Sequence, residues 1–530
     1  MNEEQTVGAM LADKRTSRRE FLAGATALGI SVAAASTMWS KAAKANPKKG
    51  GHLIAALVGG STTDNMDQQT WTDTFMISIA RATRDSLVEV GQDNSAQPGL
   101  AESWESSDDA SEWRFKLRQG VEFSNGKSLT TEDVIASIDV HRGEETRSGA
   151  KGVFQAVEDV SADGNVIVVK LAGPNADFPF LMTDYHMNVV PSPDGKPDLT
   201  NGIGTGIYKV TDFEPGVRVA MDRHANSWQA DQFGFVDSAE ILGISDPIAR
   251  QSSLVTGDVH AINKPDLKTI KLLARRPNVE IVDVASNFFY TAPMMADQEP
   301  FSSNDFRLAI KYGIDRQEFI DKIVFGYGTP GNDHPIGPGF TYHAADIPQN
   351  TYDPDKAKHH LKKSGFEGIK VDYSASDTAY PGAIDFAVLM KETLRPIGID
   401  LNVVREPNDG YWSNIWNNKP WVACYWGARP VEDMILSINY TTDAAWNDTR
   451  WGSPRVDELV VAARGELDHK KRAEMYREVQ MLISQEGSTL VPAYGRDVAA
   501  LSTEVGTTGQ YGGGWEMDGG HFIKRWWLEG

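Results

Sequence analysis

Tryptophan is concentrated in one part of the chain, beside an arginine that follows a short apolar run. Six of the 14 Trp residues lie between positions 411 and 451. Within that stretch, the apolar run from Trp421 ends at Trp426, and Gly427 and Arg429 follow it before a proline. Aromatic faces bind flat or apolar groups, and a guanidinium holds a carboxylate, sulfonate or phosphate through two parallel hydrogen bonds. This combination predicts a binding site for an anionic organic solute.

A purely structural explanation of these residues stays open. Trp is mostly buried wherever it occurs, so a large aromatic core would produce the same clustering. Arg429 would then be a loop cation paired with Glu432 or Asp433. In a binding site, by contrast, Asp433 could hold an amino group of the ligand.

Other candidate contacts are residues expected beside the tryptophans or at strand ends, where loops usually build sites. Tyr411, Trp446 and Trp451 would add aromatic walls, and the polar candidates are Asn287, Tyr290, Arg405 and Asn447.

Patterns for catalysis, phosphate binding and metal binding fail on spacing. Between Gly120 and Gly126 lie five residues, whereas a phosphate-binding P-loop needs four. The sequence contains neither a Gly-x-Ser-x-Gly elbow nor a His-Glu-x-x-His helix. The single cysteine, Cys424, lies in the apolar run with no indicated His partner. We therefore expect no catalytic residue, metal or cofactor.

The elements that must position the candidate residues are predicted as strands and helices of an α/β protein. Residues 421–426 form a short apolar run bounded by Gly and Pro, which predicts a buried strand and then a turn. Residues 52–58 predict another buried strand, and alternation over 113–117 predicts a half-buried one. Thr130 to Asp133 form a capping box, and a helical apolar stripe runs through 469–486.

Longer motifs follow one another in a recognisable order. They lie at 98–105, 113–127, 129–134, 204–210, 306–316, 326–330 and 352–358. In order and spacing they resemble the extracytoplasmic solute-binding proteins of peptide and nickel ABC importers, the family 5 of dipeptide- and oligopeptide-binding proteins. Most of these motif residues also have a local structural explanation, such as the N-cap Asp353 followed by Pro354.

The resemblance implies a two-lobed periplasmic binding protein fold, class II and cluster C type, with an additional domain inserted in the first lobe. Lobe I would comprise 46–88, 200–290 and 488–530, domain II 89–199, and lobe III 291–487. A ligand would be enclosed by hinge closure and delivered to the permease subunits of an importer, with no turnover.

The resemblance also implies ligand contacts just after the tryptophan of the lobe III strand, which Trp426 matches. Peptide-binding members place an Asp there for the α-ammonium of the peptide. In this chain the turn Gly427–Pro430 has no acid until Glu432. We therefore expect a peptide-like or a small anionic or zwitterionic solute, such as an amino-acid conjugate or an opine-like compound.

The first segment predicts export. Ser17-Arg18-Arg19-Glu20-Phe21-Leu22 and the mildly apolar run after it resemble a twin-arginine signal, and Ala43-Lys44-Ala45 fits a cleavage site. Residues 1–45 would be removed, and no Cys follows to carry a lipid anchor. We expect a monomeric periplasmic protein that is not membrane-embedded.

A formal charge of −21 at pH 7 disfavours binding to nucleic acid or anionic lipid. Two functions from other classes stay open, an exported hydrolase and a periplasmic sensor or chaperone that uses the same fold.

Overall fold

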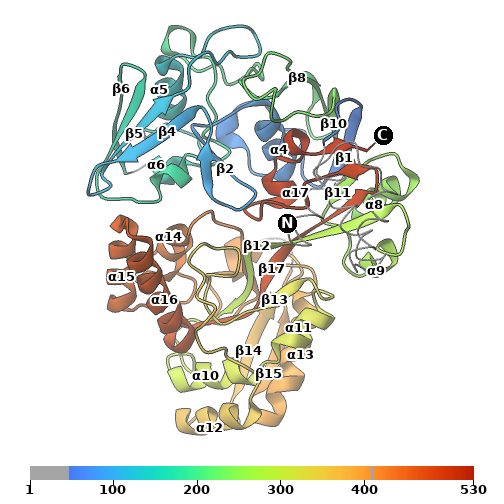
Figure 1. Cartoon of the computed structure of the whole chain (residues 1–530). Coiled ribbons are helices and arrows are strands. Elements are labelled where there is room, and N and C mark those ends of the chain that lie inside the picture. Colours follow the sequence, from blue (N-terminus) through green and yellow to red (C-terminus); the bar gives the residue numbers. More distant parts are fainter. Residues whose placement is uncertain (1–46, 155, 408–410, 530) are drawn as a thin grey trace, which may run out of the picture.

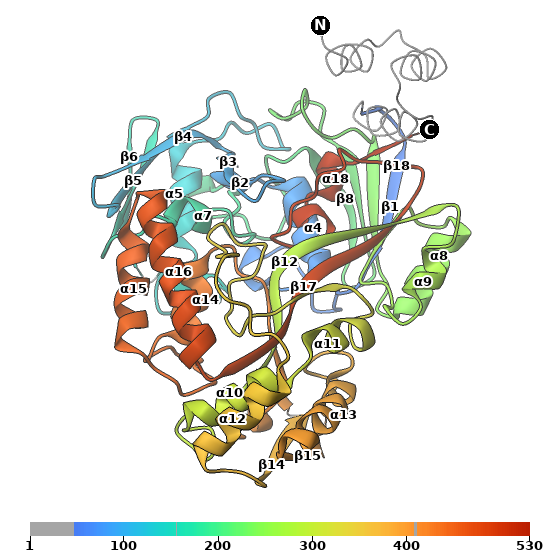
Figure 2. The same cartoon turned by 60° about the horizontal axis from the view of Figure 1, so that its bottom comes forward.

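The computed structural model describes residues 47–154, 156–407 and 411–529. The twin-arginine motif and the expected cleavage site lie outside these ranges. Two masses of mixed α/β structure are joined by the long strands β12 (Val279–Pro293) and β17 (Thr489–Ser502) (Figures 1 and 2). In the described part of the chain, no helix has the length and apolar character that crossing a membrane requires.

One large sheet has the strand order β16-β12-β17-β11-β1-β10-β9-β8, in which β13 also pairs with β17. The strands β16 and β13 pair with the parts of β12 and β17 that lie in the lower mass, and β11 to β8 belong to the upper mass (Figure 1). The predicted strand at 52–58 is confirmed as β1, which pairs in parallel with β10 and β11. Its side chains are buried over most of its length, as expected for a strand covered on both faces. The remaining strands are β8 (Tyr208–Glu214), β9 (Arg218–Arg223), β10 (Ser238–Gly243), β11 (Ala261–Asn263), β13 (Gly328–Pro330) and β16 (Cys424–Trp426).

Helices and short strands complete this mass. They are η1 (Gln68–Thr70), α4 (Thr74–Thr83), α8 (Pro247–Thr256), α9 (Ile270–Leu273), β18 (Val505–Gly506), α17 (Glu516–Gly519), α18 (Phe522–Arg525) and β19 (Trp527–Leu528). The N-cap of α4 is Asp73, whose side chain accepts a hydrogen bond from the Met76 N–H.

The region predicted as an additional domain holds its own four-stranded sheet, in the order β4-β5-β7-β6. Its elements are β2 (Val88–Val90), β3 (Ala96–Pro98), β4 (Ala101–Ser106), β5 (Glu112–Leu117), α5 (Thr131–Asp139), α6 (Lys151–Phe154), β6 (Val157–Asp163), β7 (Val166–Leu171), α7 (Phe178–Leu181) and η2 (Pro193–Gly195). The predicted capping box is confirmed, since Thr130 and Asp133 satisfy each other's backbone N–H at the start of α5.

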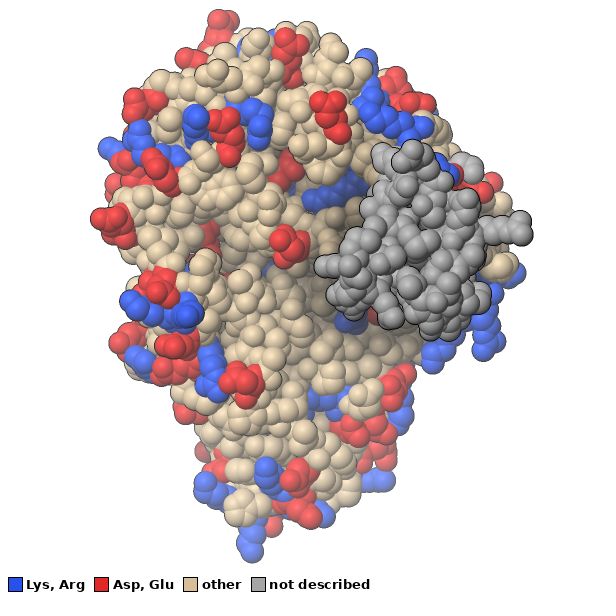
Figure 3. Space-filling view, in the orientation of Figure 1, with Lys and Arg blue, Asp and Glu red and all other residues tan. Residues whose placement is uncertain are grey.

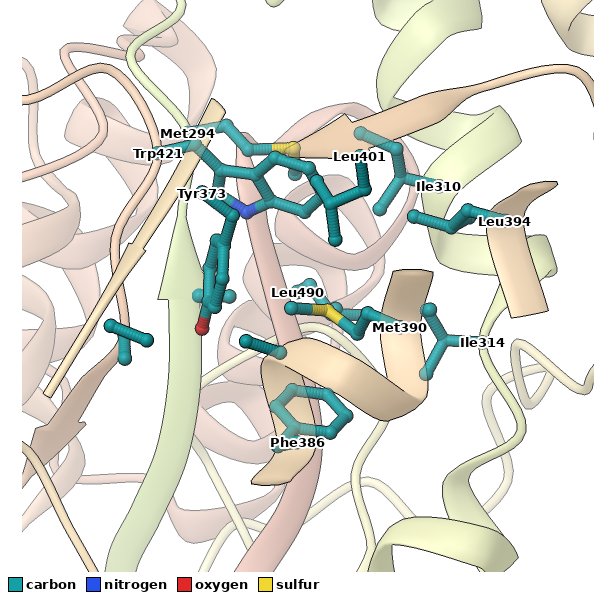
Figure 4. Packing of buried hydrophobic residues seen from close by; sticks show 14 of the residues in the cluster. Met294, Ile310, Ile314, Tyr373, Phe386, Met390, Leu394, Leu401, Trp421 and Leu490 are labelled. Carbon is teal, nitrogen blue, oxygen red and sulfur yellow. The ribbon is translucent and has the colours of Figure 1, made fainter. Parts of the chain in front are cut away.

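The lower mass combines helices with a two-stranded parallel sheet, β14 and β15. Its elements are α10 (Asn304–Gly313), α11 (Arg316–Lys322), α12 (Pro354–Ser364), β14 (Lys370–Ala375), α13 (Ala383–Leu394), η3 (Arg395–Ile397), β15 (Asp400–Arg405), η4 (Tyr411–Ile415), α14 (Glu432–Ile435), η5 (Leu436–Tyr440), α15 (Pro454–Gly465) and α16 (His469–Glu486). The helix predicted over 469–486 is confirmed. In the core of the lower mass, Trp421 packs edge-on to Tyr373, in the same cluster as Met390 and Leu394 of α13 (Figure 4).

The two long strands change register where they pass between the masses. The β12–β17 pairing shifts between Ala285 and Phe289. Gly495 lies opposite this shift, and a Cβ there would lie 2.0 Å from the ring of Phe288, so a larger residue would push the strands apart. The boundaries expected at 290 and 487 stay predictions, but both fall at this pair of strands.

Candidate ligand-binding site

Arg429 lies in the turn after β16 and has no acidic partner in the described ranges. Its Nη1 donates to the carbonyls of Gly427 (3.2 Å) and Ala428 (3.0 Å), and its own carbonyl accepts from Asn287 Nδ2 (2.8 Å). Burial lowers the pKa of Arg429, while nearby Tyr185 and Asp184 raise it. The guanidinium is therefore held in place by its own turn, with its other N–H groups left for a ligand.

The alternative ion pairs of Arg429 are not formed. Both oxygens of Asp433 accept from the Arg464 guanidinium, at 2.9 and 3.1 Å. Glu432 is buried in the lower mass, where its Oε1 accepts a hydrogen bond from the Tyr342 N–H (2.6 Å). Burial raises the pKa of Glu432 to about 7. The Asp433 carboxylate is thus paired within the protein, and its contact with an amino group of a ligand stays a prediction.

An aromatic group beside this turn is confirmed in part. Trp412, Trp416, Tyr425, Trp426 and Trp446, called the aromatic cluster below, have neighbouring ring centroids 5.8–6.2 Å apart. Three of the rings are open to solvent: Trp412 is 38% exposed, Tyr425 43% and Trp446 47%. Trp426 is only 4% exposed. The open rings are thus better placed to meet a ligand, and contact through Trp426 stays a prediction.

A buried carboxylate lies under the aromatic cluster. Asp448 Oδ2 accepts from the indole N–H of Trp416 (3.1 Å) and of Trp426 (3.2 Å), and the side chain is 3% exposed. Burial raises the pKa of Asp448 to about 6, although both indoles act to lower it. One carboxylate therefore orients two rings of the cluster. Nothing local in the sequence distinguishes Asp448 from its neighbour Asn447, which is the predicted contact.

Several predicted contacts are buried and bonded within the protein. The Tyr411 hydroxyl donates to the Ala423 carbonyl (2.7 Å), and the residue is 1% exposed. Asn447 is 4% exposed and donates to the carbonyl of Trp451 (2.7 Å), while Trp451 packs in a buried cluster with Trp426. These three side chains help to hold the region together, and a ligand contact for each stays a prediction.

The remaining candidates are divided by position. Asn287 is 6% exposed and supports the Arg429 turn through its amide. Tyr290 is half-buried and packs against Phe288, Phe319 and Tyr380. Arg405 is exposed at the end of β15, and no contact links it to the aromatic cluster within the described residues. Gly427 is half-buried in the turn. A ligand contact for each of these four stays a prediction.

The upper mass contributes to this region polar and aromatic residues that the sequence did not indicate. Lys264, after β11, pairs with Glu516 at 2.7 Å. Burial alone would lower the pKa of Lys264, but Glu516, Asp497 and Tyr425 raise it. Tyr425 belongs to the aromatic cluster, so Lys264 of the upper mass is close enough to interact electrostatically with a residue of the lower mass.

Tyr185 and Trp515 are two further aromatic residues near the Arg429 turn and the Lys264–Glu516 pair. Their ring centroids are 5.8 Å apart, and Tyr185 acts on the pKa of Arg429. Residues 185, 264 and 515 lie far in the sequence from the stretch 425–429, which is why no local pattern could reveal them. On the face shown in Figure 3, the surface is hollowed between the upper and lower parts, and charged side chains are visible in the hollow.

The arrangement offers binding chemistry. It combines a guanidinium without an acidic partner, exposed indole and phenol faces, and a lysine–glutamate pair on the facing mass. Within the described ranges, no group of three His, Cys, Asp or Glu side chains could hold a metal ion.

Comparison with known proteins gives the same fold. Heme-binding protein A of Haemophilus influenzae is 24% identical to this chain, over 77% of the chain and 81% of the relative. HbpA2 from Haemophilus parasuis superposes with a TM-score of 0.77 at 17% identity, covering 86% of this chain and 96% of that one. AgaA from A.tumefacien R10, solved in complex with agropinic acid, gives a TM-score of 0.72 at 21% identity, covering 91% and 99%.

These neighbours confirm the expected two-lobed α/β binding-protein fold, so lobe I and lobe III are used below for the upper and lower masses. Residues 95–448 match the family described as bacterial extracellular solute-binding proteins, family 5 Middle. Because this match covers most of the chain, the protein belongs to the bacterial extracellular solute-binding proteins of family 5.

Proposed function

We propose that this protein is the substrate-binding component of an ABC importer and captures a small anionic or zwitterionic organic solute in the periplasm. Lobe closure would enclose the solute and present it to the permease subunits. The observation that carries the proposal is Arg429, a guanidinium with no acidic partner in the described ranges. It follows Tyr425 by four residues, and the exposed ring of Tyr425 belongs to the same aromatic cluster as the exposed rings of Trp412 and Trp446.

The solute class follows from these groups. A guanidinium in a partly desolvated turn favours a carboxylate, sulfonate or phosphate, and the rings favour a flat or apolar body. The neighbour solved with agropinic acid shows that this fold can enclose a small organic acid. Peptide-like conjugates and opine-like compounds both fit this description.

Native mass spectrometry of the purified mature protein tests the proposal. After exchange into volatile buffer and incubation with yeast extract, the protein should retain a small molecule at one per chain. The solute should be released unchanged after prolonged incubation, because we propose capture without turnover. Deleting the protein should abolish uptake of that solute by cells. A protein that retains nothing, or that releases a cleaved product, would contradict the proposal.

The exposed indole of Trp446 should contribute measurably to affinity. Trp446→Ala should weaken binding of the retained solute by about 1–2 kcal/mol, or roughly 5- to 30-fold, because a half-exposed ring covers only one side of a ligand. Intrinsic fluorescence titration measures this change. The control is Tyr352→Ala, which removes a ring of similar exposure, 41%, just before α12. Equal affinities for Trp446→Ala and wild type would place the ring outside the site.

Export by the twin-arginine route is a further proposal, resting on Arg18 and Arg19 ahead of a mildly apolar segment. Replacing both with Lys should leave full-length precursor in the cytoplasm, since this route reads the arginine pair. Cell fractionation and immunoblotting give the measurement. Undiminished mature protein in the periplasm of the double variant would refute the assignment.

A further inference from the structure

Two buried polar atoms without hydrogen-bond partners among the described residues lie where the two lobes join. Asp497 is on β17, directly opposite Val284 of β12, and Ser286 follows on the same strand. Asp497 Oδ2 and Ser286 Oγ are both buried and make no hydrogen bond to any described residue. Ser286 is 2% exposed. Buried polar atoms nearly always have a partner, so these two atoms are available to one from outside the described chain.

Among the described residues, no cation forms an ion pair with Asp497. Lys264 acts on the pKa of Asp497, but its ammonium lies 2.7 Å from Glu516 Oε1. The other oxygen of Glu516 accepts from Asn263 Nδ2 (2.7 Å) and Thr74 Oγ1 (3.1 Å). The Lys264–Glu516 pair is therefore satisfied by itself and leaves Asp497 without a donor.

The electrostatics of Asp497 agree with this geometry. Burial and the negative charge of Glu516 raise its pKa to about 7, whereas Ser286 and Lys264 lower it. The Ser286 hydroxyl is thus close enough to act on the carboxyl group, although its Oγ makes no hydrogen bond of good geometry. A cation placed here would complete the set, because it supplies N–H donors to both oxygens and favours the ionised carboxylate.

Asp497 also lies within electrostatic reach of the candidate site. It acts on the pKa of Lys264, which Tyr425 of the aromatic cluster also affects. It acts as well on the pKa of Tyr290, the lobe-crossing residue of β12. Asp497 and Tyr425 thus both act on Lys264, and Tyr425 also acts on the pKa of Arg429.

We propose that Asp497 and Ser286 form a subsite for a protonated amine of the solute, opposite in charge to Arg429. The solute is then a zwitterion, with its acidic group on the lobe III turn and its amine on the strands that join the lobes. This inference rests on the proposed function. It moves the amine contact from Asp433, whose carboxylate Arg464 occupies, to a carboxylate that has no partner.

The test uses yeast extract and the same extract treated with acetic anhydride, which converts amines into uncharged amides. Native mass spectrometry reads the fraction of protein that carries a solute. Wild type should retain a solute from untreated extract and lose at least about 30-fold in retention from acetylated extract, the scale expected when a buried charge loses its partner. This arm needs no variant, so a folding defect cannot obscure it.

Variants locate the effect. Asp497→Asn keeps the shape but removes the charge and should retain at least about tenfold less solute from untreated extract, and Ser286→Ala should lose a smaller factor. The matched control is Asp231→Asn, an exposed lobe I residue that should bind as wild type does.

The outcomes separate the two proposals. If wild type retains nothing from either extract, the proposed function fails, and this subsite fails with it. If wild type retains acetylated and untreated solutes equally, or Asp497→Asn binds as wild type does, the amine subsite is wrong while the solute-binding function stands.

Discussion

Replacing Arg429 with alanine should weaken binding of the acidic solute by about 2–5 kcal/mol, or roughly 30- to several-thousand-fold. The loss is large because the solute's negative charge would be desolvated and left without a partner. The structure strengthens this expectation, since neither Glu432 nor Asp433 competes for the guanidinium. Two carbonyls of the turn also hold Nη1 in place, so little side-chain freedom is lost on binding.

The decisive comparison uses the retained solute and its methyl ester. Wild type should prefer the acid strongly, and Arg429→Ala should lose most of this preference. Arg429→Lys should recover part of the affinity, because an ammonium cannot make the two parallel hydrogen bonds of a guanidinium. Arg395→Ala is the control, since that side chain is 70% exposed in lobe III and its guanidinium bonds to Glu392, its one side-chain partner in the described part of the chain. Equal losses for acid and ester in Arg429→Ala would end the anion-contact hypothesis while leaving the binding-protein family intact.

Local sequence signals predicted the elements because they act over a few residues. The capping box at Thr130 and Asp133 and the Asp353–Pro354 helix start both appear as expected. The apolar run that ends at Trp426 becomes a strand only over Cys424–Trp426, because its earlier residues make isolated bridges to Met294 and Ser374. The tryptophan density left both a binding site and an aromatic core open, and the structure contains buried rings such as Trp421 beside exposed ones such as Trp446.

The partners of each polar group could not be predicted, because they come from distant segments. Arg464 lies in α15, 31 residues after Asp433. Nothing in the sequence near Asp433 indicates that its carboxylate will accept hydrogen bonds from Arg464. Asp448 and Asn447 are neighbours of equal polarity, yet only Asp448 reaches the indoles of two tryptophans. The lobe I residues Lys264 and Glu516 meet only through the fold. Composition can therefore indicate the kind of site. Which polar side chains have hydrogen-bond or ion-pair partners becomes clear only from the three-dimensional structure.

A buried ion pair between domain II and lobe III should control closure of the cleft. Arg472 of α16 donates to both oxygens of Asp177, the residue before α7, with Nη1–Oδ1 at 2.7 Å. The two side chains are 5% and 8% exposed. The Ala176 N–H also donates to the Arg464 carbonyl (2.7 Å), and Val431 belongs to the buried cluster of domain II. Figures 1 and 2 both show α15 and α16 beside this domain.

Removing one member of this pair should cost about 3–5 kcal/mol, because the other charge stays buried without a partner. Since the pair joins parts on opposite sides of the cleft, we expect this cost to open the lobes instead of unfolding them. Asp177→Asn should therefore increase the radius of gyration in small-angle X-ray scattering and weaken solute binding by at least about a hundredfold.

The double variant Asp177→Leu with Arg472→Met separates the charge effect from loss of the contact. Replacing both ions with apolar side chains of similar volume is often neutral for stability, so it should restore the closed radius and most of the affinity. Arg477→Met on the exposed side of α16 is the control, because its ion pair with Asp346 is open to solvent. If Asp177→Asn instead lowers the melting temperature with the radius and affinity unchanged, the pair belongs to a permanent interface and closure depends on contacts elsewhere.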